Sequence, residues 1–520
     1  MRASNLNAPM TRTFTLVLLA GFTATLLVAS CQKSFLDVPV QGQATTATDP
    51  NLAVNLVTGV YNSLFNGEAF GGAGGDIHGI SFIAATNIIS DDAEKGSTPG
   101  DQPSLGDLDN FNTTPTNNFV AALWNGYYSG ISRANQALVA LSTASLAPAT
   151  KNQLIGEVRF IRAYYYFNLV RFFGKVPKVV RVPKDAQDAN ADPAFQTRAS
   201  VDTIYDVITQ DLQFAVANLP IRSQSAVGHV TKGAAQALLA KTYLYRKNWQ
   251  QVQTLTQAVV SSGQYSLVPD YSVIWRYAGA NNAESIFETQ SGTFNNSDIA
   301  VAGYCTWQGP RVGPRGGWTD LGFGFCTPSL NLVNAYEAGD KRKAATIIAV
   351  DRSGRGLGTL LYDGFRLPSG DSVQNAYYNY KAYASENKNI EPYLGNREQK
   401  QKNIRLLRYA DVLLMNAEAA NELGQSAAAA TYLNQLRTRA GLPATKAASQ
   451  TDLRAAIWNE RRLELALEHD RFFDLVRQGR AAQVMKAAGK GFVVGKNELL
   501  PIPSLQIQLS GGKLDQNNGY

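Results

Sequence analysis

Apolar residues recur every three to four positions over most of the chain. This spacing predicts amphipathic helices, each with one face toward a core. The expected helices cover 53–65, 118–141, 150–173, 201–219, 232–245, 249–261, 403–422, 426–440 and 452–478. The last of these is the longest, and its pattern allows a break near His469 and Asp470. The pattern therefore predicts a mainly α protein.

Short turns join two pairs of these helices into hairpins. Lys247 and Asn248 separate 232–245 from 249–261, and Gly424 separates 403–422 from 426–440. Each pair has roughly the size of a TPR repeat, although the full TPR consensus is absent. Repeated hairpins indicate a helical-repeat scaffold. We expect it over about 50–265 and 400–490.

Two regions interrupt the helical pattern, at about 66–116 and 290–396. The first includes a polar run from Asp91 to Thr116, and a loop of this length in a compact domain is usually functional or disordered. The second is rich in Gly, Asn, Tyr and Trp and has weak periodicity. We expect loops, short helices and a little sheet there.

The N-terminus has the layout of a secretory signal peptide. Arg12 precedes an apolar run from Phe14 to Ala29, and small residues lead to Cys31. The sequence Val28-Ala29-Ser30-Cys31 looks like a lipobox, which predicts cleavage after residue 30 and a lipid on the Cys31 sulfur. An ordinary signal peptide or an N-terminal transmembrane helix is the alternative, although the run is somewhat short to span a bilayer.

The composition is that of a soluble globular protein, with 45% hydrophobic and 17% charged residues among 520. The formal net charge is +7, and removal of Arg2 and Arg12 with the signal peptide lowers it to +5. This mild excess is spread among acids along the helices. We therefore predict no nucleic-acid partner.

Three cysteines occur, and with Cys31 lipidated Cys305 and Cys326 remain. A disulfide between them is plausible in an oxidising compartment and would stabilise by about 3 kcal/mol in the chain-entropy model. Two unpaired thiols are the alternative. Two cysteines and three scattered histidines make a poor metal site, so neither a metal nor a cofactor is predicted.

Several blocks of residues share the pattern of one known family. They are 157–164 (EVRFIRAY), 174–177 (GKVP), 408–419 (RYADVLLMNAEA), 434–442 (NQLRTRAGL), 459–468 (NERRLELALE), 471–475 (RFFDL), 500–503 (LPIP) and 515–520 (DQNNGY). With Cys31 and Phe35-Leu36-Asp37, they resemble the RagB/SusD family of outer-membrane nutrient-binding lipoproteins, in order and over nearly the whole chain. His469 and Gln478 depart from the family's usual residues, but both belong to the predicted scaffold.

The resemblance implies a fold, a partner and a location. The fold is a TPR-like helical superhelix with an irregular, loop-rich ligand-binding half, which makes 31–520 one SusD-like domain after a signal peptide at 1–30. The partner is a SusC-type TonB-dependent transporter at the outer membrane, to which a lipid-anchored, surface-exposed protein delivers oligosaccharides. Some members bind peptides, and this remains an alternative.

Binding of a sugar without catalysis needs flat apolar faces together with polar side chains. The best such group in the sequence is Tyr304, Trp307, Arg311, Arg315, Trp318 and Asp320. It occupies a segment rich in Gly and Pro, and the alternative is that Trp307 and Trp318 fill a small local core. The loop 91–112 is a second candidate, which the family places near the ligand. Residues 377–380 are a third, for which packing is favoured.

Catalytic patterns are not found, and no catalytic residue is predicted. A glycosidase needs two carboxylates across a cleft, whereas the ladder Glu460, Glu464 and Glu468 is expected to be a solvated or ion-paired helix face. No nucleophile elbow, zinc-ligand spacing or P-loop occurs. A glycan-degrading enzyme and a scaffold without a ligand are therefore the less favoured hypotheses.

Overall fold

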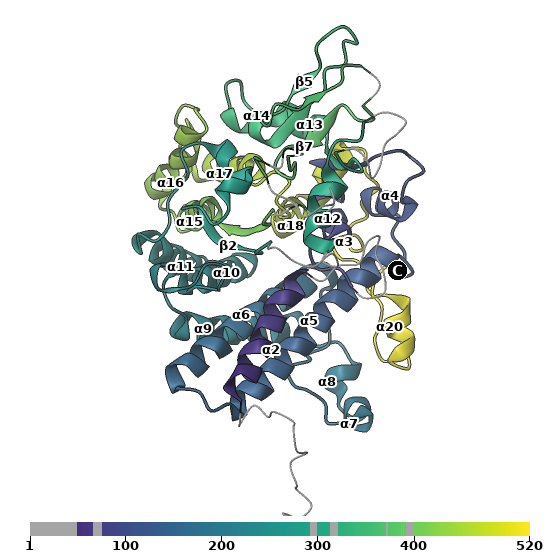
Figure 1. Cartoon of the computed structure of the whole chain (residues 1–520), viewed down its shortest axis with the longest axis vertical. Helices are drawn as coiled ribbons and strands as arrows, with labels where there is room; N and C mark the ends of the chain where they lie inside the picture. Colours follow the sequence, from purple (N-terminus) through teal and green to yellow (C-terminus); the bar gives the residue numbers. More distant parts are fainter. Residues whose placement is uncertain are drawn as a thin grey trace, which may run out of the picture.

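The computed structural model describes residues 49–65, 75–291, 299–312, 321–370, 373–385, 387, 389–391, 400 and 402–520. Within them the fold is mainly helical (Figure 1). The helices are α2 (Pro50–Asn62), α3 (Ile80–Ile83), α4 (Pro103–Asp109), α5 (Asn118–Thr143), α6 (Pro148–Phe173), α7 (Ala186–Ala191), α8 (Pro193–Gln196), α9 (Val201–Asn218), α10 (Lys232–Tyr245), α11 (Trp249–Ser261), α12 (Ile299–Gln308), α13 (Leu330–Ala335), α14 (Lys341–Thr346), α15 (Tyr409–Glu422), α16 (Ser426–Arg439), α17 (Gln450–Glu464), α18 (Arg471–Arg477), α19 (Ala481–Ala487) and α20 (Ser504–Leu509). The strands are β1 (Ala93–Gly96), β2 (Ser285–Glu288), β3 (Phe325–Pro328), β4 (Ile347–Ala349), β5 (Thr359–Leu360), β6 (Arg366–Leu367), β7 (Tyr377–Asn379) and β8 (Arg405–Arg408).

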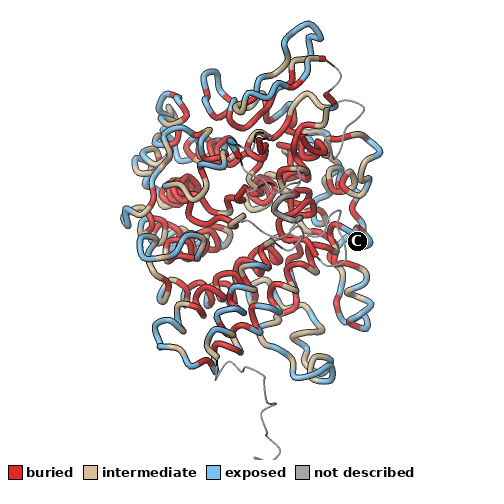
Figure 2. The backbone as a smooth tube through the Cα atoms, viewed as in Figure 1, coloured by how far each residue is buried: buried red, intermediate tan, exposed pale blue. Residues whose placement is uncertain are grey.

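The long helices form one continuous superhelix of the TPR-like kind. Each packs against the next in the order α5, α6, α9, α10, α11, α15, α16, α17. The step from α11 to α15 crosses almost 150 residues of sequence, yet the two helices are direct neighbours. Figure 2 shows the buried backbone on the inner sides of these helices and the exposed backbone at the periphery. The fold class expected from the sequence is confirmed.

Local signals explain where these helices begin and end. The side chains of Ser200, Thr231 and Asn248 accept hydrogen bonds from the first-turn amides of α9, α10 and α11. Gly424 lies in the turn between α15 and α16 and has a φ of +77°, a conformation that suits glycine. The bounds of α10 and α11 are those that the pattern predicts.

One predicted helix needs correction, and another is broken where its pattern allows a break. The segment 403–422 becomes helical only at Tyr409, because residues 405–408 form β8 and pair with β2. The segment 452–478 is divided into α17 and α18. Leu467 and His469 have positive φ angles in the break, and the side chain of Asn87 holds it by bonding the Leu467 carbonyl and the His469 amide, at 3.1 and 3.0 Å.

The strands β2 and β8 mark where the chain leaves the superhelix and returns. They are antiparallel, so the intervening residues form an insertion whose two ends lie side by side. The insertion carries its own small core of Leu321, Ile348, Leu361, Val373 and Tyr378, among others. Strand β3 of the insertion pairs with β1, which precedes α5. The irregular half is thereby joined to the N-terminal half of the superhelix.

Many charged residues of the superhelix are buried as ion pairs. Glu464 is inaccessible to solvent and lies 2.6 Å from Arg439, 3.1 Å from Arg408 and 3.2 Å from Arg342. Lys241 pairs with Asp411 and Asp470 in a second cluster. The predicted Glu460–Glu464–Glu468 face is thus ion-paired and largely buried. In the described part of the chain, no helix combines the length and apolar character needed to cross a membrane.

Candidate functional site

The two ends of the predicted sugar-binding segment are held together by backbone contacts. The amide of Phe323 donates to the Thr306 carbonyl at 2.8 Å, and the amide of Gly324 donates to the Gly309 carbonyl at 2.9 Å. A Cβ atom on Gly309 would lie 2.0 Å from the Leu321 carbonyl oxygen, so only glycine fits this closure. These bonds hold residues 306–309 beside residues 323–324. Arg315, Trp318 and Asp320 lie outside the described residues.

Tyr304 and Trp307 lie on α12 and pack into the protein. Trp307 is 3% exposed, and its ring stacks on Phe323 with centroids 5.1 Å apart. This burial leaves no open face for a sugar ring, so the packing alternative describes Trp307. The Tyr304 hydroxyl lies 3.0 Å from Nε2 of His469, which links α12 to the break between α17 and α18. Both residues support the base of the segment.

Arg311 connects this segment to the second candidate loop. Its Nη1 donates to the Ser97 hydroxyl at 2.6 Å and forms an ion pair with Asp101. Burial would raise the pKa of Asp101, but the Ser97 hydroxyl and the Arg311 guanidinium hold that pKa below its usual value. The two stretches that the sequence separates by about 200 residues are therefore in contact.

The polar run 91–116 is more regular than expected. It forms β1 and α4, and β1 pairs with β3 in the register Ala93 to Pro328 and Gly96 to Phe325. The Asp109 carboxylate is engaged by the Lys490 ammonium at 2.6 Å and by the Lys95 amide at 2.8 Å. Among the described residues, no group of three or more His, Cys, Asp or Glu side chains could hold a metal ion.

The disulfide considered from the sequence is not formed. Cys305 and Cys326 are both free and buried. Burial raises the pKa of the Cys305 thiol to about 11 and that of Cys326 further, which disfavours the reactive thiolate. A disulfide would have joined α12 to β3. The two stretches are joined instead by the backbone hydrogen bonds of Thr306 and Gly309 and by the stacking of Trp307 on Phe323.

The third candidate, 377–380, is structural. Residues 377–379 form β7, which pairs with β4. Tyr378 is fully buried, and its hydroxyl donates to the Arg311 carbonyl at 3.2 Å. The packing role favoured by the sequence is confirmed for Tyr378. Its hydroxyl adds one more support beneath Arg311.

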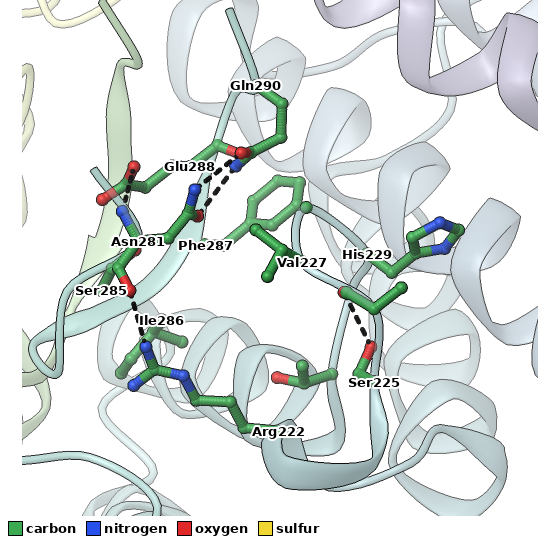
Figure 3. A pocket seen from close by; sticks show the side chains of 13 residues that line it. Arg222, Ser225, Val227, His229, Asn281, Ser285, Ile286, Phe287, Glu288 and Gln290 are labelled. Carbon is green, nitrogen blue, oxygen red and sulfur yellow. Dashed lines mark hydrogen bonds between the residues drawn. The ribbon is translucent and has the colours of Figure 1, made fainter. Parts of the chain in front are cut away.

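A pocket that the sequence did not predict lies between the α9–α10 connection and β2 (Figure 3). Its residues come from 222–231 and 281–290, two short stretches in which no aromatic cluster or motif stands out. The available signal was weak: two consecutive asparagines at 281–282 and a glycine at 228 suggest turns. The pocket depends on tertiary contact between these turns.

A TPR-like superhelix interrupted by an irregular insertion defines a class of helical-repeat binding proteins, and comparison with known proteins identifies the family. The model of the SusD family matches residues 283–520, and a model described as "Starch-binding associating with outer membrane" matches residues 84–244. A solved laminarin-binding SusD-like protein is 30% identical, with a TM-score of 0.73, over 90% of this chain and 99% of that one. The chain belongs to the SusD/RagB family.

Two further relatives agree. The surface glycan-binding protein A of Bacteroides thetaiotaomicron, solved with laminarihexaose, is 25% identical, with a TM-score of 0.75, over 90% of this chain and 99% of that one. SusD-like protein P2 of Formosa agariphila is 29% identical over 453 residues, which are 81% of this chain and 85% of the relative. The two solved relatives are named for binding laminarin or a surface glycan, and none of the three names describes catalysis.

Proposed function

We propose that this protein captures oligosaccharides at the outer membrane and delivers them to a SusC-type TonB-dependent transporter. The observation that carries the proposal is the similarity over nearly the whole chain to proteins named for binding laminarin or another surface glycan. The family model named for starch binding and outer-membrane association supports the location. A lipid on Cys31 would supply the anchor.

The binding residues proposed are those of the segment between the two closed ends. Trp318 offers an aromatic face, and Arg315 and Asp320 offer hydrogen-bonding groups for hydroxyls. Tyr304, Trp307 and Arg311, which precede these residues in the chain, have fixed contacts of their own, and this favours the assignment because a fixed support reduces the entropy lost on binding. Tyr304 and Trp307 then act as supports and not as contact surfaces.

Titration with laminarin, starch and a mixed peptide pool tests the ligand class. We expect saturable binding of a glycan and none of the peptides, and Trp318→Ala should weaken the glycan affinity at least about tenfold. Phe365→Ala is the matched control, because Phe365 is an exposed aromatic on the β6 side of a hairpin in the insertion. Binding of peptides with no glycan binding would overturn the proposed ligand class.

Co-purification tests the partner. The full-length, tagged protein, solubilised from outer membranes in mild detergent, should retain a TonB-dependent transporter. Recovery of the protein without a transporter, under conditions that keep other outer-membrane complexes intact, would contradict the delivery step while leaving glycan capture standing.

A further inference from the structure

The pocket in Figure 3 has the construction of a small ligand site, and none of its lining residues belongs to the segment 310–321. Its volume is about 110 Å³, somewhat less than the roughly 150 Å³ of an engineered protein cavity that holds benzene. One side is the connection between α9 and α10, and the other is β2 with the residues that precede it. The lining residues are Arg222, Ser225, Ala226, Val227, Gly228, His229, Thr231, Asn281, Ser285, Ile286, Phe287, Glu288 and Gln290.

Arg222 fixes the two sides together. Its Nη2 donates to the carbonyls of Asn281 and Asn282 at 2.9 and 2.7 Å, and its Nη1 donates to those of Gln264 and Ala283 at 3.3 Å each. Four N–H groups thus meet four carbonyl oxygens, and the guanidinium also lies 5.3 Å from the ring centre of Tyr265. The fork that would bind a carboxylate or sulfate is already occupied.

The opposite side is fixed by a pair of amides. Asn281 and Gln290 bond each other reciprocally, at 2.8 and 3.0 Å. Asn281 has a φ of +54°, and its amide donates to Oε2 of Glu288 at 3.1 Å. A Cβ atom on Gly228 would lie 2.5 Å from Cγ of Gln290, so the loop approaches this pair as closely as glycine allows. The pocket is therefore formed before any ligand arrives.

The groups left over determine which ligand fits. Asn281 keeps one N–H and one oxygen lone pair, and Ser285 also lines the pocket. Val227, Ile286 and Phe287 supply an apolar surface. The Glu288 carboxylate is bound by the Asn281 amide, by Asn403 and by Arg405, so it offers no free charge to a cation. The lining therefore combines polar groups, among them the ionisable His229, with apolar carbon.

We propose that this pocket is a second subsite, which binds one neutral sugar ring of a glycan. The C–H face of the ring would pack on Val227 and its neighbours, and hydroxyls would bond Asn281 and Ser285. This rests on the proposed function, because a single ring binds weakly in so small a contact and the subsite serves a longer glycan. A longer glycan that also contacts another site on the protein would gain affinity from the two linked contacts.

The test separates the two sites with a small probe. The probe is methyl β-D-glucoside, and its binding is measured by saturation-transfer NMR. The measurement is made on Trp318→Ala, which lacks the proposed aromatic contact of the first site, and on the same variant with Val227→Asp added. We expect the added change to weaken probe binding by about tenfold or more. Val227 is 76% exposed, so the substitution leaves the fold intact. Val139→Asp on α5, at 56% exposure, is the matched control and should leave binding unchanged.

A second variant addresses the polar groups. Asn281→Asp keeps the size of the side chain and tolerates the positive φ, but it removes the N–H groups of the amide. Loss of probe binding with an unchanged melting temperature supports the subsite. Equal probe binding with and without Val227→Asp, in a protein whose wild type binds laminarin, would overturn the subsite and leave the proposed function standing. A wild type that binds no glycan would overturn both.

Discussion

Nδ1 of His229 lies 2.9 Å from Oε2 of Glu157, a carboxylate oxygen of a residue that is fully buried in α6. The Tyr61 hydroxyl donates to the same oxygen at 2.7 Å and accepts a bond from the Val230 amide. Gln153 donates to the other carboxylate oxygen. The His229 side chain is nearly half exposed, at 46%. The buried Glu157 carboxylate is therefore paired with an imidazolium that can lose its proton to solvent.

This pair predicts a pH-dependent stability near neutrality. The hydrogen bond to Glu157 raises the pKa of His229 above its usual value of 6.5. A raised pKa in the folded state means that the protonated histidine stabilises fully below about pH 6.5, and this stabilisation is lost as the pH rises through the folded pKa. The melting temperature should therefore fall between pH 6 and pH 8, and His229→Gln should remove most of that fall.

The other two histidines provide the internal control. Burial lowers the pKa of His78 to about 4 and that of His469 to about 3, so both stay neutral over the same range. An NMR titration of the three imidazoles should show one transition above pH 6.5 and none from His78 or His469 until well below pH 5. A His229 transition below 6.5 would contradict the assigned role of Glu157.

Glu464 is predicted to be the most sensitive single charge of the superhelix. It faces Arg342, Arg408 and Arg439, and although burial opposes ionisation, these arginines hold its pKa well below the usual range. Glu464→Gln keeps the volume but removes the one carboxylate that all three guanidinium groups share, and leaves them only their bonds to other acids such as Glu284 and Glu460. Removal of one partner from a buried pair costs about 3–5 kcal/mol of unfolding free energy. Urea unfolding followed by tryptophan fluorescence measures this loss.

Glu337→Gln is the matched control for that experiment. Glu337 pairs with Arg437 at 2.7 Å, but its side chain is 43% exposed. Exposed pairs contribute less than about 1 kcal/mol, so this variant should unfold close to the wild type. If both variants lose a similar amount of unfolding free energy, the buried cluster contributes no more to stability than the exposed pair.

The helical scaffold could be predicted because its signals are local. The amphipathic period, the N-cap residues of α10 and α11 and the glycine that follows α11, Gly263, all lie within a few residues of the ends that they define. The strand β8 could not, because residues 405–408 become extended only by pairing with β2, which is more than a hundred residues away. The sequence allows a break near His469, but the contact that holds it comes from Asn87, almost 400 residues earlier.

The site was predictable only in part, for the same physical reason. A tryptophan in a glycine-rich segment is equally suited to a sugar ring and to a local core, and the sequence does not show that Phe323 stacks on Trp307. The pocket beside Arg222 could not be predicted, because its polar residues look like ordinary turn residues in the sequence. They form a pocket only in the fold, where the Arg222 guanidinium donates to four backbone carbonyls.

Trp307 and Trp318 should respond differently to truncation. Trp307→Ala removes a ring that is buried against Phe323 and should lower the unfolding free energy by about 3–5 kcal/mol. Trp318→Ala should lower glycan affinity with little change in stability. Parallel measurement of urea unfolding and laminarin binding on both variants checks this division. A stable Trp307→Ala protein with weakened binding would instead assign Trp307 to the ligand contact.

The two buried cysteines should behave as inert thiols. A soluble form that begins at residue 32 contains only Cys305 and Cys326, and both are free. A thiol reagent should detect two groups per chain after denaturation without a reductant, and almost none in the folded protein, because burial raises the pKa of both. The melting temperature should be the same with and without dithiothreitol. No reactive thiol after denaturation would show that a disulfide forms in the exported protein.

The proposed lipid on Cys31 gives the last prediction, which separates anchoring from folding and from binding. In the sequence, 17 residues lie between Cys31 and Asp49, which caps α2. A change at Cys31 is therefore remote in sequence from the superhelix and from both candidate sites. In Cys31→Ala, we expect the melting temperature and laminarin affinity to match the wild type while the protein moves from the membrane fraction to the soluble fraction. Ser30→Thr, which leaves the cysteine in place, is the control for changes near the cleavage site. Retention of Cys31→Ala in washed membranes would mean that docking to the transporter, and not the lipid, is the main attachment.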